Sequence, residues 1–558
     1  MELLDWIVIG VFALALIGII VWVVKQKQNS SADYFLGGRD ATWIAIGASI
    51  FASNIGSEHL IGLAGAGASS GMAMAHWEIQ GWMILILGWV FVPFYSRSMV
   101  YTMPEFLERR YNKESRSILS VISLISYVLT KVAVTVYAGG LVFQQVFGIK
   151  ELWGIDFFWI AAIGLVLLTA LYTVLGGMKS VLYTSVLQTP ILLLGSLIIL
   201  VLGFKALGGW DEMMRICSVT TVNEYGNTMT DLIRHNGDAN YPWLGALIGS
   251  AIIGFWYWCT DQYIVQRVLS GKNQKEARRG SIFGAYLKLL PVFLFLIPGM
   301  IAFALAKEGI VINGEVFALS TPDAAFPTLV AKLLPAGVKG LVVCGILAAL
   351  MSSLASLFNS SAMLFTIDFY KRFRPQTAEK QLVRIGQVAT VVIVVLGILW
   401  IPIMRSVGDV LYAYLQDVQS VLAPGIAAAF LLGICWKRAS AKGGMWGLIA
   451  GIVIGLTRLG AKVYYSNAAE TTENLFKYVF YDVNWLFFCG WMFLFCLVVV
   501  VVVSLCTAAP GAEKIQGLVF GTSTAAQRAE TRASWNRWDV IHTCIILGIT
   551  AAFYWYFW

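Results

Sequence analysis

The polar residues best suited to binding a solute lie where the chain is otherwise apolar. One apolar segment, at 42–66, contains Ser53, Asn54, Glu58 and His59 near its middle. A continuous helix facing lipid does not accommodate such a cluster, whereas a helix interrupted there exposes free backbone groups to a cavity. The alternative is an unbroken helix that packs tightly through its small residues, with Glu58 and His59 paired internally. We favour the interrupted helix.

Two charged residues, Lys288 and Glu78, also lie inside apolar segments. A lysine at the middle of a membrane costs roughly 2.5–3.5 kcal/mol on the insertion scale, so its presence indicates a function. The alternative for Lys288 is that its long side chain reaches back to the cytoplasmic interface. An acid and a lysine facing one cavity would leave it nearly neutral. Such a cavity suits an uncharged, hydroxyl-rich ligand better than an amino acid or an anion.

Hydroxyl and aromatic side chains mark two further apolar segments. Ser352 and Ser353 are adjacent in one of them. Sodium is a hard cation that takes oxygen ligands, so two hydroxyls and the carbonyls of a broken helix would form a neutral site of low affinity. The alternative is that both serines bond to the preceding turn of their own helix. Tyr257 and Trp258 belong to an aromatic run that could stack on a sugar ring, or could form an interfacial belt.

The composition places these residues in a membrane protein. The chain has 558 residues, of which 59% are hydrophobic and only 13% are charged, against about 25% charged in soluble proteins. The net charge of +8 comes from basic residues in short loops, which favours contact with anionic lipid and not with nucleic acid. The sequence contains no CxxC pair, HExxH, GxSxG or P-loop, and its four histidines are scattered. We therefore expect neither an enzyme nor a metal cluster.

About fourteen helices should span the bilayer, since each span needs about 20 apolar residues. The predicted spans are 5–25, 42–66, 71–96, 117–146, 156–175, 181–205, 243–266, 281–306, 337–368, 384–405, 408–435, 443–460, 485–506 and 539–558. Most lysine and arginine residues fall in alternate loops, which the positive-inside rule assigns to the cytoplasm. That assignment places both termini on the extracytoplasmic side of a cell membrane.

Several sequence motifs resemble the sodium/glucose cotransporters of the solute:sodium symporter family. They are ASIFASNIGSEHLIGLAGAG, TMPEFLERRY, YTVLGGMKSVLYTSVLQT, WYWCTDQYIVQRVLSGKN, YLKLLP and MSSLASLFNSSAMLFTIDFY. The resemblance extends from about residue 30 to residue 460. It implies an all-α membrane protein of the LeuT type, with two inverted five-helix repeats at 42–205 and 243–435. Helices at 5–25 and 443–558 would flank them, and the short 507–538 segment is typical of bacterial members.

The resemblance also implies roles for individual residues. The positions that match the family's sugar-contacting residues are Asn54, His59, Glu78, Lys288 and Gln416, with Tyr257 as the aromatic that gates the sugar from the cytoplasmic side and Trp258 as its neighbour in the site. The sodium site would use the carbonyls of Ala52, Ile55 and Ala349 and the hydroxyls of Ser352 and Ser353. Two positions depart from the family pattern. Ser185 replaces an aspartate, and Ala355 replaces a threonine implicated in a second sodium site.

The resemblance implies a sodium-driven symporter that imports a neutral monosaccharide, of the glucose or galactose type, with sodium as the co-transported ion. The two departures remove oxygen ligands from one place, so we expect one sodium per sugar. The alternatives are a symporter of the same fold for inositol, sialic acid or another small solute, and a sugar sensor that does not transport.

Overall fold

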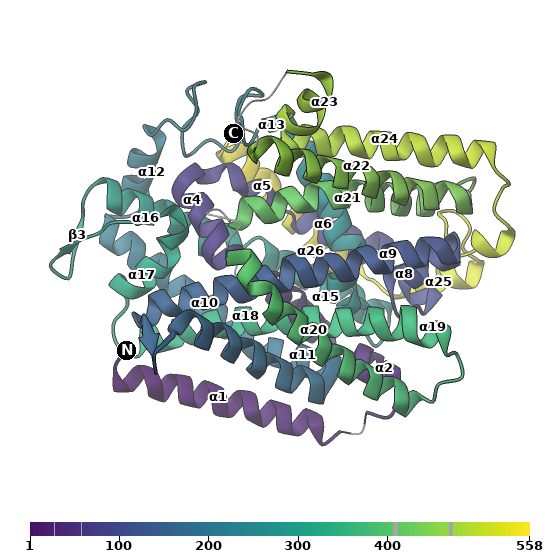
Figure 1. The fold of residues 1–558 in the computed structure, drawn as a ribbon, viewed down its shortest axis with the longest axis horizontal. Coiled ribbons are helices and arrows are strands. Elements are labelled where there is room, and N and C mark those ends of the chain that lie inside the picture. Colours follow the sequence, from purple (N-terminus) through teal and green to yellow (C-terminus); the bar gives the residue numbers. More distant parts are fainter. Residues whose placement is uncertain (27, 57, 406–410, 468–472) are drawn as a thin grey trace.

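The computed structural model describes residues 1–26, 28–56, 58–405, 411–467 and 473–558, apart from some side chains within these ranges. Nearly all regular structure is helical (Figure 1). The exceptions among the described residues are two short antiparallel hairpins, β1 (Glu151–Leu152) with β2 (Ile155–Asp156) and β3 (Val311–Ile312) with β4 (Glu315–Val316).

The helices follow one another along the chain with short connections. Those of the first half are α1 (Leu3–Val24), α2 (Ser31–Leu36), α3 (Trp43–Asn54), α4 (Ala64–Ser70), α5 (Ala75–Glu78), α6 (Gly81–Ile86), α7 (Val92–Ser98), α8 (Met103–Arg110), α9 (Lys113–Ser126), α10 (Ala133–Phe147), α11 (Phe157–Leu207) and α12 (Trp210–Ser218). Those of the second half are α13 (Trp243–Gly254), α14 (Gln262–Leu269), α15 (Gln274–Lys288), α16 (Ile297–Lys307), α17 (Ala325–Leu333), α18 (Val338–Met363), α19 (Lys371–Phe373), α20 (Glu379–Arg405), α21 (Leu411–Cys435), α22 (Ala441–Asn467), α23 (Leu475–Lys477), α24 (Trp485–Cys506), α25 (Ala525–Ala533) and α26 (Arg537–Tyr556).

Wider or tighter turns join several of these helices into longer rods. The wide π-turns are η2 (Glu58–Leu63), η4 (Leu87–Phe91), η5 (Tyr127–Val132), η6 (Phe255–Thr260), η7 (Val292–Leu296), η9 (Leu364–Tyr370) and η10 (Tyr478–Asp482). The tight 3-10 turns are η1 (Gly37–Arg39), η3 (Gly71–Met74), η8 (Pro322–Ala324) and η11 (Ala512–Lys514). Wide turns are frequent at functional sites, and two of them, η2 and η6, border the cavity described below.

All fourteen predicted spans coincide with helical segments, although residues 57 and 408–410 lie outside the described residues. Eleven helices in the described part are long and apolar enough to cross a membrane. The numbers differ because α11 holds two spans in 51 residues, while the second and fourth spans are divided into shorter pieces. Gly177 marks the bend inside α11 with φ 52°, a conformation that glycine adopts easily, and a Cβ there would collide with the Tyr34 carbonyl.

Two spans are interrupted where the chain turns extended. The α3 helix ends at Asn54, and Ile55 follows with φ −78° and ψ 110°. The η6 turn ends at Thr260, and Asp261 follows with φ −76° and ψ 126°. The backbone therefore leaves the helical conformation in nearly the same way at both places. Each break releases carbonyls and amides that a ligand or another side chain must satisfy.

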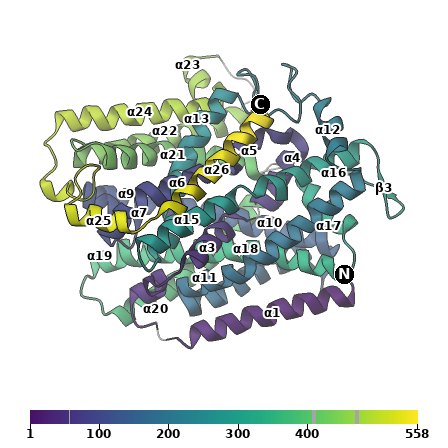
Figure 2. The same ribbon diagram turned by 180° about the vertical axis from the view of Figure 1, so that it is seen from behind.

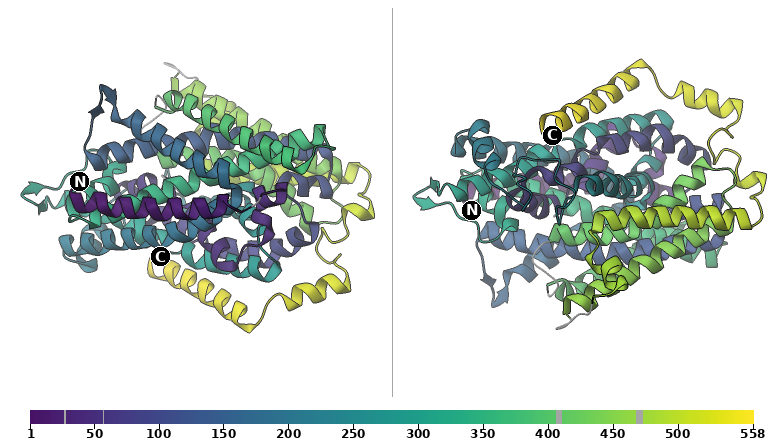
Figure 3. Two further views of the ribbon diagram at one scale, coloured as in Figure 1. Left: turned by 90° about the horizontal axis from the view of Figure 1, so that it is seen from below. Right: turned by 90° about the horizontal axis from the view of Figure 1, so that it is seen from above.

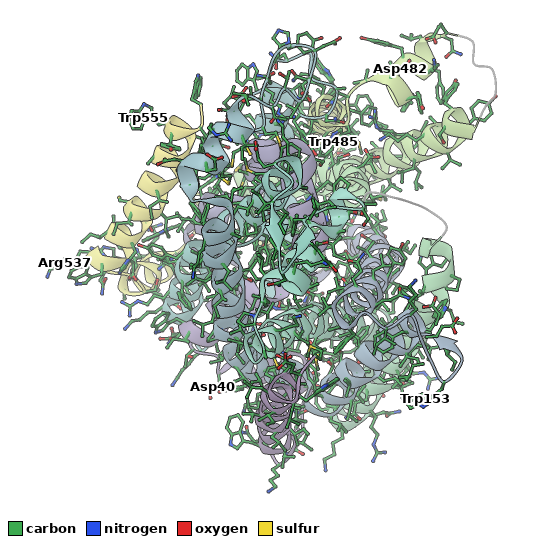
Figure 4. The ribbon with its side chains drawn as sticks, turned by 90° about the vertical axis from the view of Figure 1, so that its left-hand side faces the viewer. Asp40, Trp153, Asp482, Trp485, Arg537 and Trp555 are labelled. Carbon is green, nitrogen blue, oxygen red and sulfur yellow. The ribbon has the colours of Figure 1, made fainter. Side chains whose placement is uncertain are left out.

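The helices are buried to very different degrees. Within the most apolar part of α18, 89% of the residues are buried, against 17% for α1 and 22% for α26. The α18 helix packs against α11, α3 and α20 in the interior, while α1 and α26 lie along outer edges of the molecule (Figures 2 and 3). Figure 4 shows Arg537 and Trp555 projecting from α26 at the surface. The outer helices thus present apolar faces to lipid, and the polar residues gather inside.

Arg110 is a buried cation that holds the end of a membrane helix. Its guanidinium donates to three carbonyls around the end of α21, those of Gly433 at 2.6 Å, Trp436 at 2.9 Å and Ala439 at 3.0 Å. Arginine satisfies the free carbonyls there and is favoured by the negative end of the helix dipole.

We expect Arg110→Met to lower the apparent melting temperature of the purified protein by several degrees, because three buried carbonyls lose their donor at about 1–3 kcal/mol each. Arg109→Met is the matched control. Arg109 is 44% exposed and forms a surface ion pair with Glu105, so its loss should cost less than about 1 kcal/mol. Melting followed by size-exclusion chromatography measures both, and equal stability of the two variants would contradict this role for Arg110.

Candidate functional site

A small cavity lies in the interior beside both helix breaks. It is bordered by α3, η2, α5, α13, η6, α15 and α21. Its lining contains all seven residues expected to contact substrate, Asn54, His59, Glu78, Tyr257, Trp258, Lys288 and Gln416, together with Glu58, Trp77, Gln80, Ile253, Gly254 and Gln419. Most of these residues carry polar side chains that converge on one place, as expected of a site that orients a small solute.

Lys288 and Glu78 form the charged centre of the cavity. The Lys288 ammonium lies 2.6 Å from Glu78 Oε2 and donates to Asn54 Oδ1 at 3.2 Å. His59 Nε2 lies 3.3 Å from the same Glu78 oxygen. Lys288 therefore does not reach for the cytoplasm, since it is 3% exposed and paired inside the protein. The His59 ring thus contacts Glu78, which lies on another helix.

The aromatic and amide residues complete the wall. The Asn54 amide donates to the Tyr257 hydroxyl at 3.2 Å. Trp258 packs edge-on against Tyr257, and the Lys288 ammonium lies 5.4 Å from the centre of a Trp258 ring. Gln416 Oε1 is buried without a hydrogen-bond partner among the described residues. An unpaired buried carbonyl oxygen is costly, so this position is suited to accept a hydrogen bond from a bound solute.

The five expected sodium ligands lie on α3, its break and α18, and all five residues are buried. Ser353 Oγ donates to the Ile55 carbonyl at 3.0 Å and to the Ser53 carbonyl at 3.1 Å. Ser352 Oγ lies 3.3 Å from Ser185 Oγ. Ala52 lies in the last turn of α3, and Ala349 lies one turn before the serines in α18.

A neutral oxygen site of this kind suits a monovalent hard cation. The released carbonyl of Ile55 and the Ser353 hydroxyl already converge, and no carboxylate belongs to the set. Gly56 keeps the approach open, because a Cβ there would lie 2.8 Å from Ser353 Oγ. Ser353 thus bonds across to the broken helix, whereas Ser352 lies beside Ser185 on α11. The sodium site itself stays a prediction.

Sequence reasoning missed several polar residues of this region. Glu58 was noted in the apolar segment but not assigned to the cavity, and Gln80 and Gln419 were not singled out. Gln419 follows Gln416 by three positions and therefore shares its helix face. Lys131 and Asp261 form a buried ion pair at 2.9 Å near Tyr257. Lys131 could have been found by the rule that flagged Lys288, namely a charge inside an apolar span.

Comparison with known proteins gives consistent results. The family model described as "Sodium:solute symporter family" matches residues 34–451. The "Sodium/myo-inositol cotransporter 2" of Sus scrofa is 37% identical over 542 residues, which cover 94% of this chain and 79% of that protein. The "Sodium/myo-inositol cotransporter" of Homo sapiens is 37% identical over 525 residues, covering 89% and 72%. These relatives are transporters, which agrees with the expectation that the chain is not an enzyme.

Among solved structures, the substrate-bound outward-open state of a sodium-coupled sialic acid symporter is similar, with a TM-score of 0.72 and 22% identity. The similarity covers 91% of this chain and 99% of that one. The transporter MhsT in complex with L-phenylalanine has a TM-score of 0.50 at 12% identity. At these identities the similarity concerns the fold alone, and it confirms the expected LeuT type.

Proposed function

We propose that this chain, which belongs to the sodium:solute symporter family, imports a neutral cyclic polyol of the myo-inositol type together with sodium. Membership of the family makes it a multi-pass membrane transporter with sodium as the co-transported ion. The further step is the substrate. The observation that carries it is a nearly neutral, polar cavity in a chain whose relatives include sodium/myo-inositol cotransporters.

The expectation of glucose or galactose as substrate has no support in these relatives. The inositol alternative that the sequence left open agrees with them better. Both kinds of molecule present a ring with hydroxyls that donate and accept hydrogen bonds, so residues expected to bind a sugar also suit an inositol. Glu78 would accept from ring hydroxyls, Lys288 would donate, and Gln416 Oε1 would gain the partner it lacks.

The charges of the cavity argue against an anionic solute such as sialic acid. Lys288 is the one lysine or arginine of the lining among the described residues, and Glu78 already neutralises it at 2.6 Å. A solute carboxylate would therefore find no free lysine or arginine there to offset its loss of hydration. A neutral polyol avoids this loss and still engages both donors and acceptors.

The proposed cycle follows from the position of the two breaks. Sodium would bind between Ile55 and Ser353 and stabilise the interrupted second span. The polyol would then bind to Asn54, one residue before the break, so that each ligand favours the other's site. Entry of sodium supplies the driving force, since one charge crossing 100 mV is worth about 2.3 kcal/mol.

The internal organisation is part of the same proposal. We assign the inverted repeats to 42–205 and 243–435. Each repeat then begins with an interrupted span, and the backbone conformations at the two breaks, Ile55 and Asp261, are nearly identical. The extracytoplasmic placement of both termini and the bacterial source stay predictions from the sequence.

Uptake into proteoliposomes tests the proposal. The purified protein, with an inward sodium gradient, should accumulate labelled myo-inositol well above vesicles with a choline gradient. Labelled glucose, galactose and sialic acid in the same assay identify the substrate class. Uptake of sialic acid in preference to all neutral solutes, or binding of inositol without any uptake, would contradict the proposal.

The sodium stoichiometry is a separate prediction. Ser185 carries no charge, and its hydroxyl donates to the Val181 carbonyl at 2.7 Å, while Ala355 offers no side-chain oxygen. We therefore expect one sodium per solute, measured from reversal potentials or dual-isotope flux. The variant with Ser185→Asp and Ala355→Thr restores the oxygens of the family pattern and should move the ratio towards two. A ratio of two in the unmodified protein would refute this prediction.

A further inference from the structure

A buried lysine outside the substrate cavity lies between the two proposed ligand sites. Lys131 belongs to η5, in the middle of the fourth span, and is 7% exposed. Its ammonium lies 2.9 Å from Asp261 Oδ2, at the break of the seventh span. Figure 1 shows α9 and α10, which η5 joins, following one another across the molecule. This ion pair therefore ties the fourth span to the point where the seventh span is interrupted.

Aromatic rings enclose the same ammonium group. The centre of the Tyr263 ring lies 4.6 Å from Lys131 Nζ, that of Tyr257 4.7 Å, and that of Tyr127 5.3 Å. Cations are attracted to the faces of aromatic rings at such distances, and more strongly when desolvated. We call Lys131, Asp261 and the three tyrosines the Lys131 cluster.

The Asp261 carboxylate is held from several sides. Besides Lys131, the Tyr127 hydroxyl donates to Asp261 Oδ1, and the Tyr263 backbone amide lies 3.3 Å from that oxygen. The same amide donates to the Tyr127 oxygen at 3.0 Å. Asp261 thus caps the start of α14 while Lys131 neutralises its charge.

Two tyrosines of the cluster reach consecutive residues of the broken second span. The Tyr257 hydroxyl accepts from the Asn54 amide, which belongs to the substrate cavity. The Tyr263 hydroxyl donates to the Ser53 carbonyl, the oxygen to which Ser353 of the proposed sodium site also donates. Tyr257 thus contacts the proposed polyol site and Tyr263 contacts the proposed sodium site. Both tyrosines pack around the Lys131 ammonium.

We propose that Lys131 is a positioning residue that couples sodium binding to substrate binding. Its fixed positive charge holds Asp261 and the two tyrosines in one arrangement, so that Ser53 and Asn54 are set together. Without the charge, the sodium site and the substrate site keep their own contacts. They lose the fixed arrangement of the Lys131 cluster, through which binding at one site affects the other. This inference rests on the proposed sodium symport and adds the residue through which its two ligands communicate.

The test compares substrate affinity with and without sodium. Binding of labelled myo-inositol to the purified protein in lipid nanodiscs is measured at zero and at saturating sodium, and the ratio of the two affinities is the coupling factor. Unmodified protein should give a factor of about ten or more. In Lys131→Met the factor should fall to within about twofold of one, with inositol affinity at zero sodium changed less than about threefold. Lys131→Arg keeps the charge and should retain most of the coupling.

A double variant separates coupling from folding. Lys131→Met leaves Asp261 as an unpaired buried charge, which destabilises the protein. Adding Asp261→Asn removes that charge and keeps a good helix cap. We expect the double variant to regain stability and to stay uncoupled, because the fixed cation is still missing. Recovery of coupling together with stability would show a merely structural role and overturn the inference.

A second buried ion pair provides the matched control. Arg116 and Asp368 lie 2.6 Å apart, away from the residues of both proposed ligand sites. The variant with Arg116→Met and Asp368→Asn should keep the coupling factor within twofold of that of the unmodified protein. If that control loses coupling as fully as Lys131→Met, or if Lys131→Met stays coupled, the inference is wrong. Absence of sodium-dependent uptake and binding in the unmodified protein would instead overturn the proposed function, and the coupling role with it.

Discussion

Replacing Lys288 by alanine should abolish solute uptake while leaving sodium binding largely intact. Lys288 is the one lysine or arginine among the described residues of the cavity lining, and its ammonium joins Glu78 at 2.6 Å to Asn54 at 3.2 Å. Hydrogen bonds from a charged donor are worth about 1.5–3 kcal/mol each. Lys288→Ala removes one such bond to the solute and also the bonds that hold Glu78 and Asn54 in place. Uptake should therefore fall about a hundredfold or more.

Gln416→Ala removes a proposed solute contact with less disturbance to the protein. Since Gln416 Oε1 has no hydrogen-bond partner within the described residues, no internal bond to that atom is lost. Uptake should fall at least about tenfold, as expected for one hydrogen bond of the ligand. Gln387→Ala is the matched control, because Gln387 donates to the Val174 carbonyl outside the cavity. Initial rates of sodium-driven uptake and sodium binding to the same preparations measure the outcome, and a parallel loss of sodium binding would point to misfolding.

The architecture could be predicted from the sequence because the bilayer restricts it so strongly. Every backbone group must be satisfied inside a span, so long apolar runs become helices and their order is nearly fixed. The interrupted second span was also foreseeable, since Ser53, Asn54, Glu58 and His59 do not belong in lipid. The exact end of the helix at Asn54 was not, because the extended conformation of Ile55 leaves no mark in hydropathy.

The sequence predicted which residues belong to the site, but not which of them contact one another. Its seven proposed substrate contacts were assigned through the family resemblance, and the structure places them around one cavity. The partner of His59 was ambiguous, because the neighbouring Glu58 is as plausible in sequence as Glu78 on the next span. Only the three-dimensional structure decides between them, with His59 Nε2 at 3.3 Å from Glu78.

The partners of Lys131 could not be predicted from its own segment of the sequence. A lysine in an apolar span always needs a partner, but the sequence did not show that its partner would be Asp261, 130 positions away. The three tyrosines around it come from two spans, so their convergence on one ammonium group is a property of the fold. The substrate also could not be settled from the residues, because inositols and hexoses present the same donors and acceptors to a neutral cavity.

Ser353→Ala should have the opposite effect to the cavity variants, weakening sodium first. Ser353 Oγ bonds to the carbonyls of Ile55 and Ser53, so it is the one expected ligand hydroxyl that touches the broken helix directly. Losing one oxygen ligand at about 1–2 kcal/mol should raise the half-saturating sodium concentration by about tenfold. Solute affinity at saturating sodium should change little.

Ser360→Ala, on the same helix, removes a buried hydrogen bond to Gln266 at 2.7 Å and should leave sodium dependence unchanged. The comparison is made by uptake at graded sodium concentrations. Both variants lose one buried hydroxyl from α18, so an equal rise of the half-saturating sodium concentration in the two would assign the effect to helix packing. An unchanged half-saturating sodium concentration in Ser353→Ala would show that this serine is not part of the sodium site.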